Sequence, residues 1–209
     1  MPVISFVTQK GGSGKSTLAI NCAVAASQSG KRVFLLDMDA QRTAYLWGEL
    51  RSDDKPDVVR VDAPHLDTAL DLAREKKFDW VLIDTPGHES PGTVKAISAA
   101  DFCVIPCRPT HADVQAIPPT IDSVRRLNKP AAIVLAQTPV RSFRITDAES
   151  ALGQLIQVCP VHIVSRTAYQ DAQAQGFGVT EYDDEGKAAE EVRALWQWIA
   201  TKARKASNG

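Results

Sequence analysis

The sequence predicts a doubly wound α/β fold, in which a mainly parallel sheet carries helices on both faces. Strand-like and helical segments alternate along the whole chain, a pattern that favours strand–helix–strand units. Several strand segments are nearly continuous apolar runs, as at 33–36 and 81–83, which is typical of parallel strands that are covered on both sides. The chain has 209 residues, 44% of them hydrophobic and 23% charged. These values suit one globular domain, expected over residues 1–209, with a sizeable core.

Seven strands and eight helices are expected in alternation. β-branched and aromatic residues indicate strands at 2–8, 32–37, 58–62, 79–84, 101–107, 131–137 and 159–165. Apolar spacing of three and four residues indicates helices at 16–29, 41–50, 66–77, 92–99, 113–127, 144–157, 168–175 and 186–205. No internal repeat or low-complexity linker divides the chain, and the last residues, 206–209, are expected to be a frayed tail. In such a fold, ligands bind at the carboxyl ends of the strands.

Composition limits the classes of function. The formal net charge is −1, so any contact with nucleic acid must come from a local basic patch. The chain enters its first strand without a charged leader, and no apolar run approaches the roughly 20 residues that span a bilayer. The cysteines have no cluster or disulfide spacing and the histidines have no metal-ligand spacing, so both are interpreted as core or surface residues of a cytoplasmic protein. They are Cys22, Cys103, Cys107, Cys159, His65, His88, His111 and His162.

A phosphate-binding loop follows the first strand. Three glycines within residues 11–14 let the backbone N–H groups turn toward a polyphosphate, and the helix that begins there adds its positive dipole end. Lys15 is placed to reach the β and γ phosphates, and Ser16 to hold Mg²⁺. The usual template expects glycine at position 9, where this chain has Gln9, and the loop instead begins with a second lysine, Lys10. The predicted nucleotide contacts are Lys10, Gly11, Gly12, Ser13, Gly14, Lys15, Ser16 and Thr17.

Two acidic motifs end neighbouring strands in the expected order. Asp37 and Asp39 close the second strand, and Asp84 closes an apolar strand that leads into Thr85-Pro86-Gly87. A carboxylate at the end of a buried strand is the usual way to reach a bound metal, often through water. The sequence therefore predicts an ATP site with Mg²⁺ held by Ser16, Asp37 and Asp84. A surface turn with two solvated aspartates is the alternative for residues 37–39.

These motifs together resemble the deviant Walker A loop and acidic motifs of the ParA/MinD family of P-loop ATPases, and the resemblance covers almost the whole chain. It implies that Lys10 crosses the interface of an ATP-bridged homodimer and touches the phosphates of the partner's nucleotide. It also implies three catalytic residues, Lys10, Lys15 and Asp39, with Asp39 positioning the attacking water. The family commonly has proline where this chain has Ala40, which loosens the loop without removing its acids.

The end of the sixth strand occupies the stretch that approaches adenine in members of that family. Gln137 and Thr138 are therefore the predicted contacts with the base. The alternative, which the sequence favours equally, is that both are ordinary polar residues at a strand end.

The most similar members are short ParA-type partition proteins. The resemblance implies an ATP-dependent dimer that binds non-specific DNA, associates with the nucleoid in the cytoplasm, and segregates a plasmid, chromosome or protein cargo. A ParB-like or other cargo adaptor would stimulate an ATPase that is weak alone. The alternatives on the same fold are a MinD-like spatial regulator at a membrane, and an ATP switch or metal carrier without DNA. A membrane partner is disfavoured because the apolar stripe of the last helix is interpreted as core.

Two further segments are candidates for partner contacts. Basic residues end the last helix, where they complement its dipole, and a DNA patch is the functional alternative; its candidates are Lys202, Arg204 and Lys205, with Arg141, Arg144 and Arg166 as neighbours. The proline-punctuated stretch of residues 105–113 and Pro118-Pro119 resembles a segment near the dimer or higher-order interface of short ParA-type proteins. A simple strand-to-helix crossover, with Asp113 as the helix cap, is the alternative for this stretch.

Overall fold

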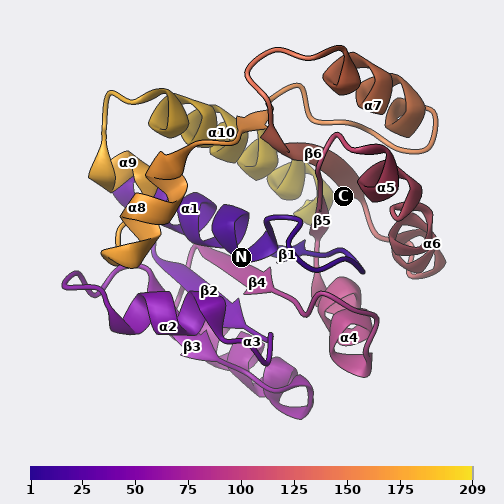
Figure 1. The fold of residues 1–209 in the computed structure, drawn as a ribbon. Coiled ribbons are helices and arrows are strands. Elements are labelled where there is room, and N and C mark those ends of the chain that lie inside the picture. The colour runs from indigo at the N-terminus through magenta and orange to yellow at the C-terminus, as the bar shows by residue number, and fades with distance from the viewer. Residues whose placement is uncertain (209) are drawn as a thin grey trace.

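The computed structural model describes residues 1–208, and a seven-stranded parallel sheet forms the middle layer of these residues (Figure 1). The strand order is β3-β2-β4-β1-β5-β6-β7. The strands are β1 (Val3–Phe6), β2 (Val33–Asp37), β3 (Asp57–Arg60), β4 (Trp80–Asp84), β5 (Phe102–Cys107), β6 (Ala131–Thr138) and β7 (Ile163–Val164). The predicted fold class is confirmed. The central position of β1 places the loop after it in the middle of the sheet's carboxyl edge, where the direction of strand order reverses.

Helices cover both faces of the sheet. Their bounds are α1 (Lys15–Gln28), α2 (Thr43–Glu49), α3 (Leu66–Glu75), α4 (Pro91–Ala99), α5 (His111–Gln115), α6 (Pro118–Arg126), α7 (Phe143–Gly153), α8 (Thr167–Ala174), α9 (Val179–Tyr182) and α10 (Lys187–Ser207). A short 3-10 helix, η1 (Ala63–His65), precedes α3. Alternation along β1 divides the core: Ile4 and Phe6 pack with α1 and α10, whereas Val3 and Val7 face the opposite layer.

The helix predicted over 113–127 is wrong, because the chain forms two helices there. Thr110 caps α5 by accepting a hydrogen bond from the backbone N–H of Asp113, at 3.2 Å. Asp113 is therefore in the first turn of α5 and is not its cap. Pro118 and Pro119 then start α6. They have no N–H to donate to the carbonyls of the preceding turn, so the first helix ends and a second one begins.

The last third of the chain departs from the prediction at four places. Helix α7 ends at Gly153, four residues before the end predicted for it. Within the segment predicted as a strand over 159–165, only Ile163–Val164 forms β7. The four-residue helix α9 has no counterpart in the prediction. Helix α10 continues through Ser207, so residues 206 and 207 of the expected tail are helical, and Gly209 lies outside the described residues.

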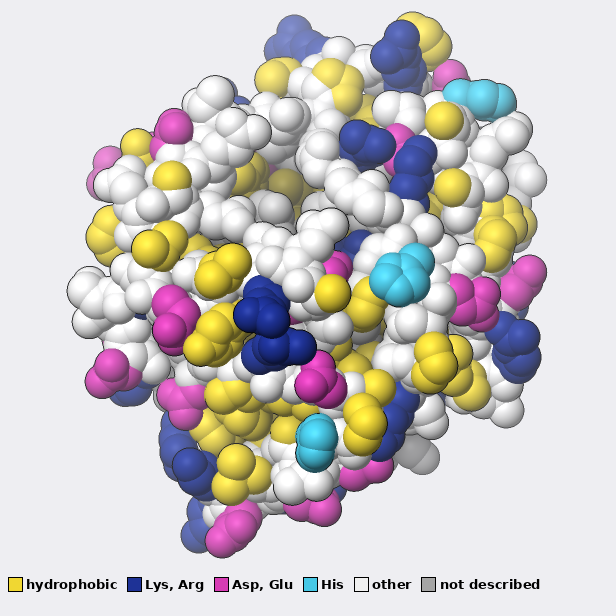
Figure 2. All heavy atoms as spheres, turned by 60° about the horizontal axis from the view of Figure 1, so that its bottom comes forward, with side chains coloured by type: hydrophobic (Ala, Val, Ile, Leu, Met, Phe, Trp, Pro, Cys, Tyr) yellow, Lys and Arg dark blue, Asp and Glu magenta, His cyan; other side chains and the backbone are white. Residues whose placement is uncertain are grey.

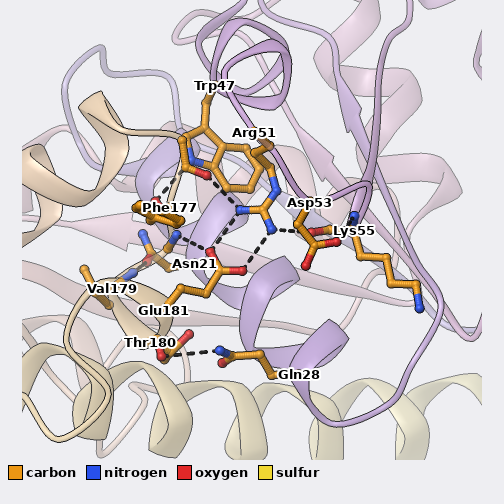
Figure 3. A network of polar contacts seen from close by, with 12 residues as sticks. Asn21, Gln28, Trp47, Arg51, Asp53, Lys55, Phe177, Val179, Thr180 and Glu181 are labelled. Carbon is orange, nitrogen blue, oxygen red and sulfur yellow. Dashed lines mark hydrogen bonds and ion pairs between the residues drawn. The ribbon is translucent and has the colours of Figure 1, made fainter.

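A buried polar network anchors α2 to the segment around α9 (Figure 3). Both terminal nitrogens of Arg51 donate to the carboxylate of Glu181, each at 2.9 Å, and the guanidinium lies 4.7 Å from the ring centroid of Trp47. The indole N–H of Trp47 donates to the carbonyl of Phe177 at 3.1 Å. Asn21 of α1 accepts a hydrogen bond from the N–H of Val179 at 2.8 Å. Helix α2 is thereby fixed at the end that lies away from the phosphate loop.

Candidate nucleotide-binding site

The phosphate loop borders a cavity of about 440 Å³ at the carboxyl edge of the sheet. Its other walls come from residues 39–41 and Thr43 after β2, from Gly87 and His88 after β4, and from Gln137. Gly12 and Gly14 have φ values of 72° and 102°, a conformation that residues with a side chain adopt only under strain. Helix α1 begins at Lys15, directly after this turn, so its first N–H groups are directed toward the loop.

Lys15 is buried at the floor of this cavity, with 6% of its surface exposed. Burial lowers the pKa of its ammonium group, while the charges of Asp84 and Asp39 act in the opposite direction. The glycine at position 87 leaves room for this group: a Cβ there would lie 3.4 Å from Lys15 Nζ and 3.1 Å from Gly11 Cα. The loop after β4 therefore packs directly on the phosphate loop, and a cation is held between them.

Asp84 has the chemistry of a buried ligand for a hydrated cation. The residue is fully buried, and neither carboxylate oxygen has a hydrogen-bond partner among the described residues. Burial raises the pKa of Asp84 to about 7, although the nearby Ser16 hydroxyl and Lys15 lower it. A buried carboxylate without partners is unfavourable, and a hydrated Mg²⁺ would satisfy it. Residues 1–208 hold no group of three His, Cys, Asp or Glu side chains arranged for a metal.

Asp37 organises the chain between β2 and α2. Its two oxygens accept hydrogen bonds from the N–H groups of Asp39, at 2.9 Å, and Tyr45, at 2.8 Å. Asp37 is fully buried, so it is not a solvated turn residue. Burial raises its pKa, and the bonds from Tyr45 and Asp39 oppose that rise. Asp39 is half-buried, lines the cavity, and accepts a hydrogen bond from the N–H of Gln41 at 2.9 Å.

Lys10 forms an ion pair with Asp113 at the start of α5, with Nζ 2.7 Å from Oδ1. Arg108 and Thr110 bond to the same carboxylate. Although burial raises the pKa of Asp113, the hydrogen bonds from Lys10, Thr110 and Arg108 hold it below the usual range. Lys10 is not a wall residue of the 440 Å³ cavity. A contact of Lys10 with a second copy therefore requires that it leave Asp113.

The two residues predicted to contact the base lie in different surroundings. Gln137 is exposed, has a φ of 52°, and donates from Nε2 to the carbonyl of Gly12 at 3.0 Å. Gln137 thus joins the phosphate loop. Thr138 is fully buried, and it lines neither the main cavity nor a smaller cavity beside it. That smaller cavity has a volume of about 160 Å³ and lies between Gln137 and the chain after β7.

Comparison with known proteins agrees with this geometry. The model of the family described as "CobQ/CobB/MinD/ParA nucleotide binding domain" matches residues 4–195. The chain belongs to this family. A relative, "Maintenance of carboxysome distribution protein A" of Halothiobacillus neapolitanus, is 29% identical over 204 residues, which cover 92% of this chain and 93% of that protein.

Solved structures of this CobQ/CobB/MinD/ParA family have the same fold. The MinD cell division protein of Aquifex aeolicus superposes with a TM-score of 0.80 at 17% identity, covering 96% of this chain and 98% of that one. MinD of Pyrococcus horikoshii, solved as a complex with Mg-ADP, gives a TM-score of 0.74 at 18% identity and covers 95% of each chain.

The basic residues predicted as one patch are not brought together in this member of the family. Lys202 and Arg204 lie over the rings of Trp198 and Trp80, at 5.3 and 5.1 Å from the ring centroids. Trp80 begins β4, so this end of α10 lies at the amino edge of the sheet. Arg141 and Arg144 follow β6, at the carboxyl edge. Figure 2 shows Lys and Arg side chains interspersed with Asp and Glu over the face in view.

Some residues at the site have roles that the sequence did not assign. His88 lines the main cavity, although it is predicted as a structural or surface residue; its position four residues after Asp84 is the signal that indicates otherwise. Arg166, predicted as a neighbour of the DNA patch, lines the smaller cavity and pairs with Glu191. It follows the carboxyl end of β7, where ligands of such sheets bind.

No helix within residues 1–208 combines the length and apolar character needed to cross a membrane.

Proposed function

We propose that this chain is a ParA-type positioning ATPase, in which two copies close on two ATP molecules. The observation that carries the proposal is a buried cation on the wall of the main cavity, Lys15, with a buried carboxylate that has no partner, Asp84, close to Lys15 and to the wall residue Ser16. Lys15 Nζ donates to the carbonyl of Lys10 at 3.4 Å, which leaves its charge unneutralised, and the Asp84 carboxylate has no hydrogen bond within residues 1–208. A nucleotide triphosphate with Mg²⁺ has the complementary charges. Family membership supports nucleotide as the ligand.

The residues present fit such a ligand. The glycine turn and the N-terminus of α1 offer backbone N–H groups to the phosphates, and Lys15 offers its ammonium group. Ser16 and Asp84 would hold Mg²⁺, the carboxylate acting through water. Bound there, Mg²⁺ neutralises charge on the β and γ phosphates. Asp39, on the wall of the cavity, orients the attacking water.

Lys10 gives the dimer its dependence on ATP. In this proposal it leaves Asp113 and reaches the phosphates of the nucleotide that the second copy holds, as an arginine finger does. The dimer binds non-specific DNA through exposed basic residues, and an adaptor on the cargo stimulates hydrolysis. The name of the relative from Halothiobacillus neapolitanus, a protein that maintains carboxysome distribution, supports positioning of a cargo as the task.

Binding to DNA tests this proposal. Purified protein is titrated against a duplex of random sequence with ATP and Mg²⁺, or with ADP and Mg²⁺, over a series of salt concentrations. We expect binding that requires ATP and weakens steeply with salt, because phosphate contacts release counterions. Absence of binding with both ATP and ADP would contradict the proposal that the dimer binds DNA. Sedimentation with liposomes then tests the membrane alternative.

Asp39→Ala tests the dimer separately from DNA. The variant keeps Lys15, so it should bind ATP but hydrolyse it slowly and accumulate as a dimer. Size-exclusion chromatography with ATP and Mg²⁺ measures this, and the same variant with ADP is the control. A variant that stays monomeric with ATP counts against the role of Asp39.

A further inference from the structure

Gln9 and Lys10, at the start of the phosphate loop, are both held by the segment that contains α5 and α6. The backbone N–H of Gln9 donates to Oγ1 of Thr120 at 3.2 Å, and its Nε2 donates to Oγ of Ser123 at 3.4 Å. Nζ of Lys10 lies 2.7 Å from Oδ1 of Asp113, in the first turn of α5. Gln9 stands where the usual template has glycine, which has no side chain to make such a contact. The start of the loop is therefore anchored to both helices.

Asp113 binds Lys10 but does not depend on it. The side chain of Asp113 is 4% exposed. Its Oδ1 accepts from Lys10 and, at 3.1 Å, from Nη2 of Arg108, while Oδ2 accepts from Nε of Arg108 at 3.1 Å and from the hydroxyl of Thr110. If Lys10 leaves, each oxygen keeps a donor and the carboxylate keeps a cation. Release of Lys10 therefore avoids the large cost of a buried charge without a partner.

Lys10 is also held only weakly by this ion pair. Its side chain is 32% exposed, and Asp113 is the carboxylate with which it pairs within residues 1–208. An ion pair that is partly open to water contributes little free energy, because solvent screening and side-chain freedom oppose it. The paired and free positions of Lys10 therefore differ by a small free energy, which a ligand of higher charge can overcome.

We propose that Asp113 is an autoinhibitory positioning residue, which holds Lys10 within its own copy and so opposes closure of the dimer. The inference rests on the proposed function, since it assumes that Lys10 serves a nucleotide bound to a second copy. Two acceptors then compete for one ammonium group: the carboxylate of Asp113 in the single copy, and the phosphates of the second copy's nucleotide in the dimer. A triphosphate carries more negative charge than a carboxylate, so ATP favours the dimer. The copies that can close are those in which Lys10 is free, and the apparent dissociation constant of the dimer rises as this fraction falls.

Asp113→Asn tests the inference directly. The substitution removes the charge that holds Lys10, and its amide oxygen can still accept a bond from Arg108. Each copy should gain about threefold in competence, as expected for a partly exposed ion pair. Because the dimer contains two copies, its dissociation constant should fall about tenfold. Sedimentation velocity over a series of protein concentrations measures this constant, with Mg²⁺ and a non-hydrolysable ATP analogue so that hydrolysis does not reverse closure.

Two controls show whether the change is specific to dimerisation. The affinity of single copies for the analogue, measured at protein concentrations too low for dimers, should be the same in Asp113→Asn and wild type. Asp122→Asn is the matched variant, because Asp122 is an exposed carboxylate on α6 and the same charge is removed. Its dimer should keep the dissociation constant of wild type.

Arg108→Ala should shift the dimer in the opposite direction. Without the guanidinium, Lys10 is the one cation left on Asp113 within residues 1–208, so it is held more tightly and the dissociation constant should rise. This rise should disappear when Asp113→Asn is also present, because no carboxylate then holds Lys10. Damage to the start of α5 alone would weaken the dimer in both single variants. Thermal unfolding without nucleotide shows whether each variant folds. If Asp113→Asn does not fold, Arg108→Ala decides the question, and an unchanged or stronger dimer then overturns the inference.

The outcomes distinguish this inference from the proposed function. A wild-type dimer that is as strong as that of Asp113→Asn, or stronger, overturns the inference and leaves the proposed function intact. A gain from Asp113→Asn that persists when Lys10→Ala is also present overturns it as well, because the effect would not pass through Lys10. Failure of both wild type and Asp113→Asn to dimerise with the analogue contradicts the proposed function itself, and with it this inference.

Discussion

Arg51 and Asp84 are both buried charged residues, and their surroundings are opposite in kind. The side chain of Arg51 is 3% exposed, and both of its terminal nitrogens are bonded, to Glu181 and to the carbonyls of Gly176 and Lys55. Asp84 is fully buried with both oxygens unpartnered. The charge of Arg51 is paired within the fold, with only Nε left without a bond, and it holds α2 in place (Figure 3). Asp84 has no such partner and lies close to Lys15 and Ser16 on the wall of the cavity, as expected where a ligand supplies the missing partner.

Lys15→Ala should show the largest effect at the proposed nucleotide site, where Asp84 has no partner. We expect a loss of ATP affinity of at least about a hundredfold, because a charge-assisted contact in a buried site is removed. Lys10→Ala is the matched control: Lys10 lies outside the cavity, so this variant should bind ATP nearly as well as wild type but fail to dimerise. Titration with a fluorescent ATP analogue measures the affinity of both variants, and size-exclusion chromatography with ATP and Mg²⁺ measures dimerisation. Equal losses of ATP affinity in the two variants would contradict the separate roles of Lys15 and Lys10.

Arg51→Ala should show the largest effect in the network of Arg51 and Glu181, which is paired within the fold. Removing one partner leaves the carboxylate of Glu181, which is 19% exposed, without its main bonds, and we expect a loss of about 3 kcal/mol in the free energy of unfolding. Urea denaturation measures the loss, and ATP affinity should stay within about twofold. The double variant Arg51→Met with Glu181→Leu should recover most of the stability. A drop in ATP affinity as large as that of Lys15→Ala would contradict the division into a structural and a ligand site.

The comparison also shows which features the sequence predicts. The motifs at 10–17, 37–39 and 84–87 are short, and each lies at the end of its own strand, so the parallel sheet brings them together whatever the loops do. The strands themselves are predicted from short runs of apolar residues, because a buried strand leaves a pattern that can be recognised within a few neighbouring residues. The positions of the strands, and of the motifs at their ends, can therefore be predicted from local sequence.

Features that depend on distant partners were not predicted. Lys10 is paired with Asp113, a residue more than a hundred positions away, and Arg166 is oriented by Glu191 from another helix. No spacing in the sequence indicates either ion pair. The helix over 113–127 was predicted whole because its apolar spacing continues across Pro118-Pro119, although the missing N–H groups break it. The basic residues at 141, 144, 202, 204 and 205 are grouped by residue type in the prediction, and the sheet separates them to opposite edges.

Asp84→Asn should give the smallest of these effects, and it should increase the stability of the protein although it changes a residue of the proposed site. The pKa of Asp84 in the folded protein is about 7, against about 3.9 for an unfolded chain. Between these values the folded state holds a proton that the unfolded state has released, so this group's contribution to stability falls as pH rises from 4 to 7. A difference of about 3 in pKa corresponds to about 4 kcal/mol. Without Mg²⁺ or nucleotide, Asp84→Asn should therefore stabilise the protein at pH 8, by about 2 kcal/mol once the cost of a buried amide without partners is subtracted, and the gain should disappear toward pH 4.

Denaturation of wild type and variant across this pH range measures the effect. Asp37, Asp39 and Lys15 act on Asp84 and remain in both proteins, so the difference between the two curves isolates Asp84. Asp71→Asn is the control, since that carboxylate is exposed and pairs only with Arg74 at the surface; its change should stay below about 0.5 kcal/mol. With Mg²⁺ and ATP, wild type should instead be more stable than Asp84→Asn, because wild type gains the stabilisation of its ligand and the variant gains less. A variant that is less stable than wild type at pH 8 without ligand would mean that the fold itself satisfies Asp84, and the contrast with Arg51 would fail.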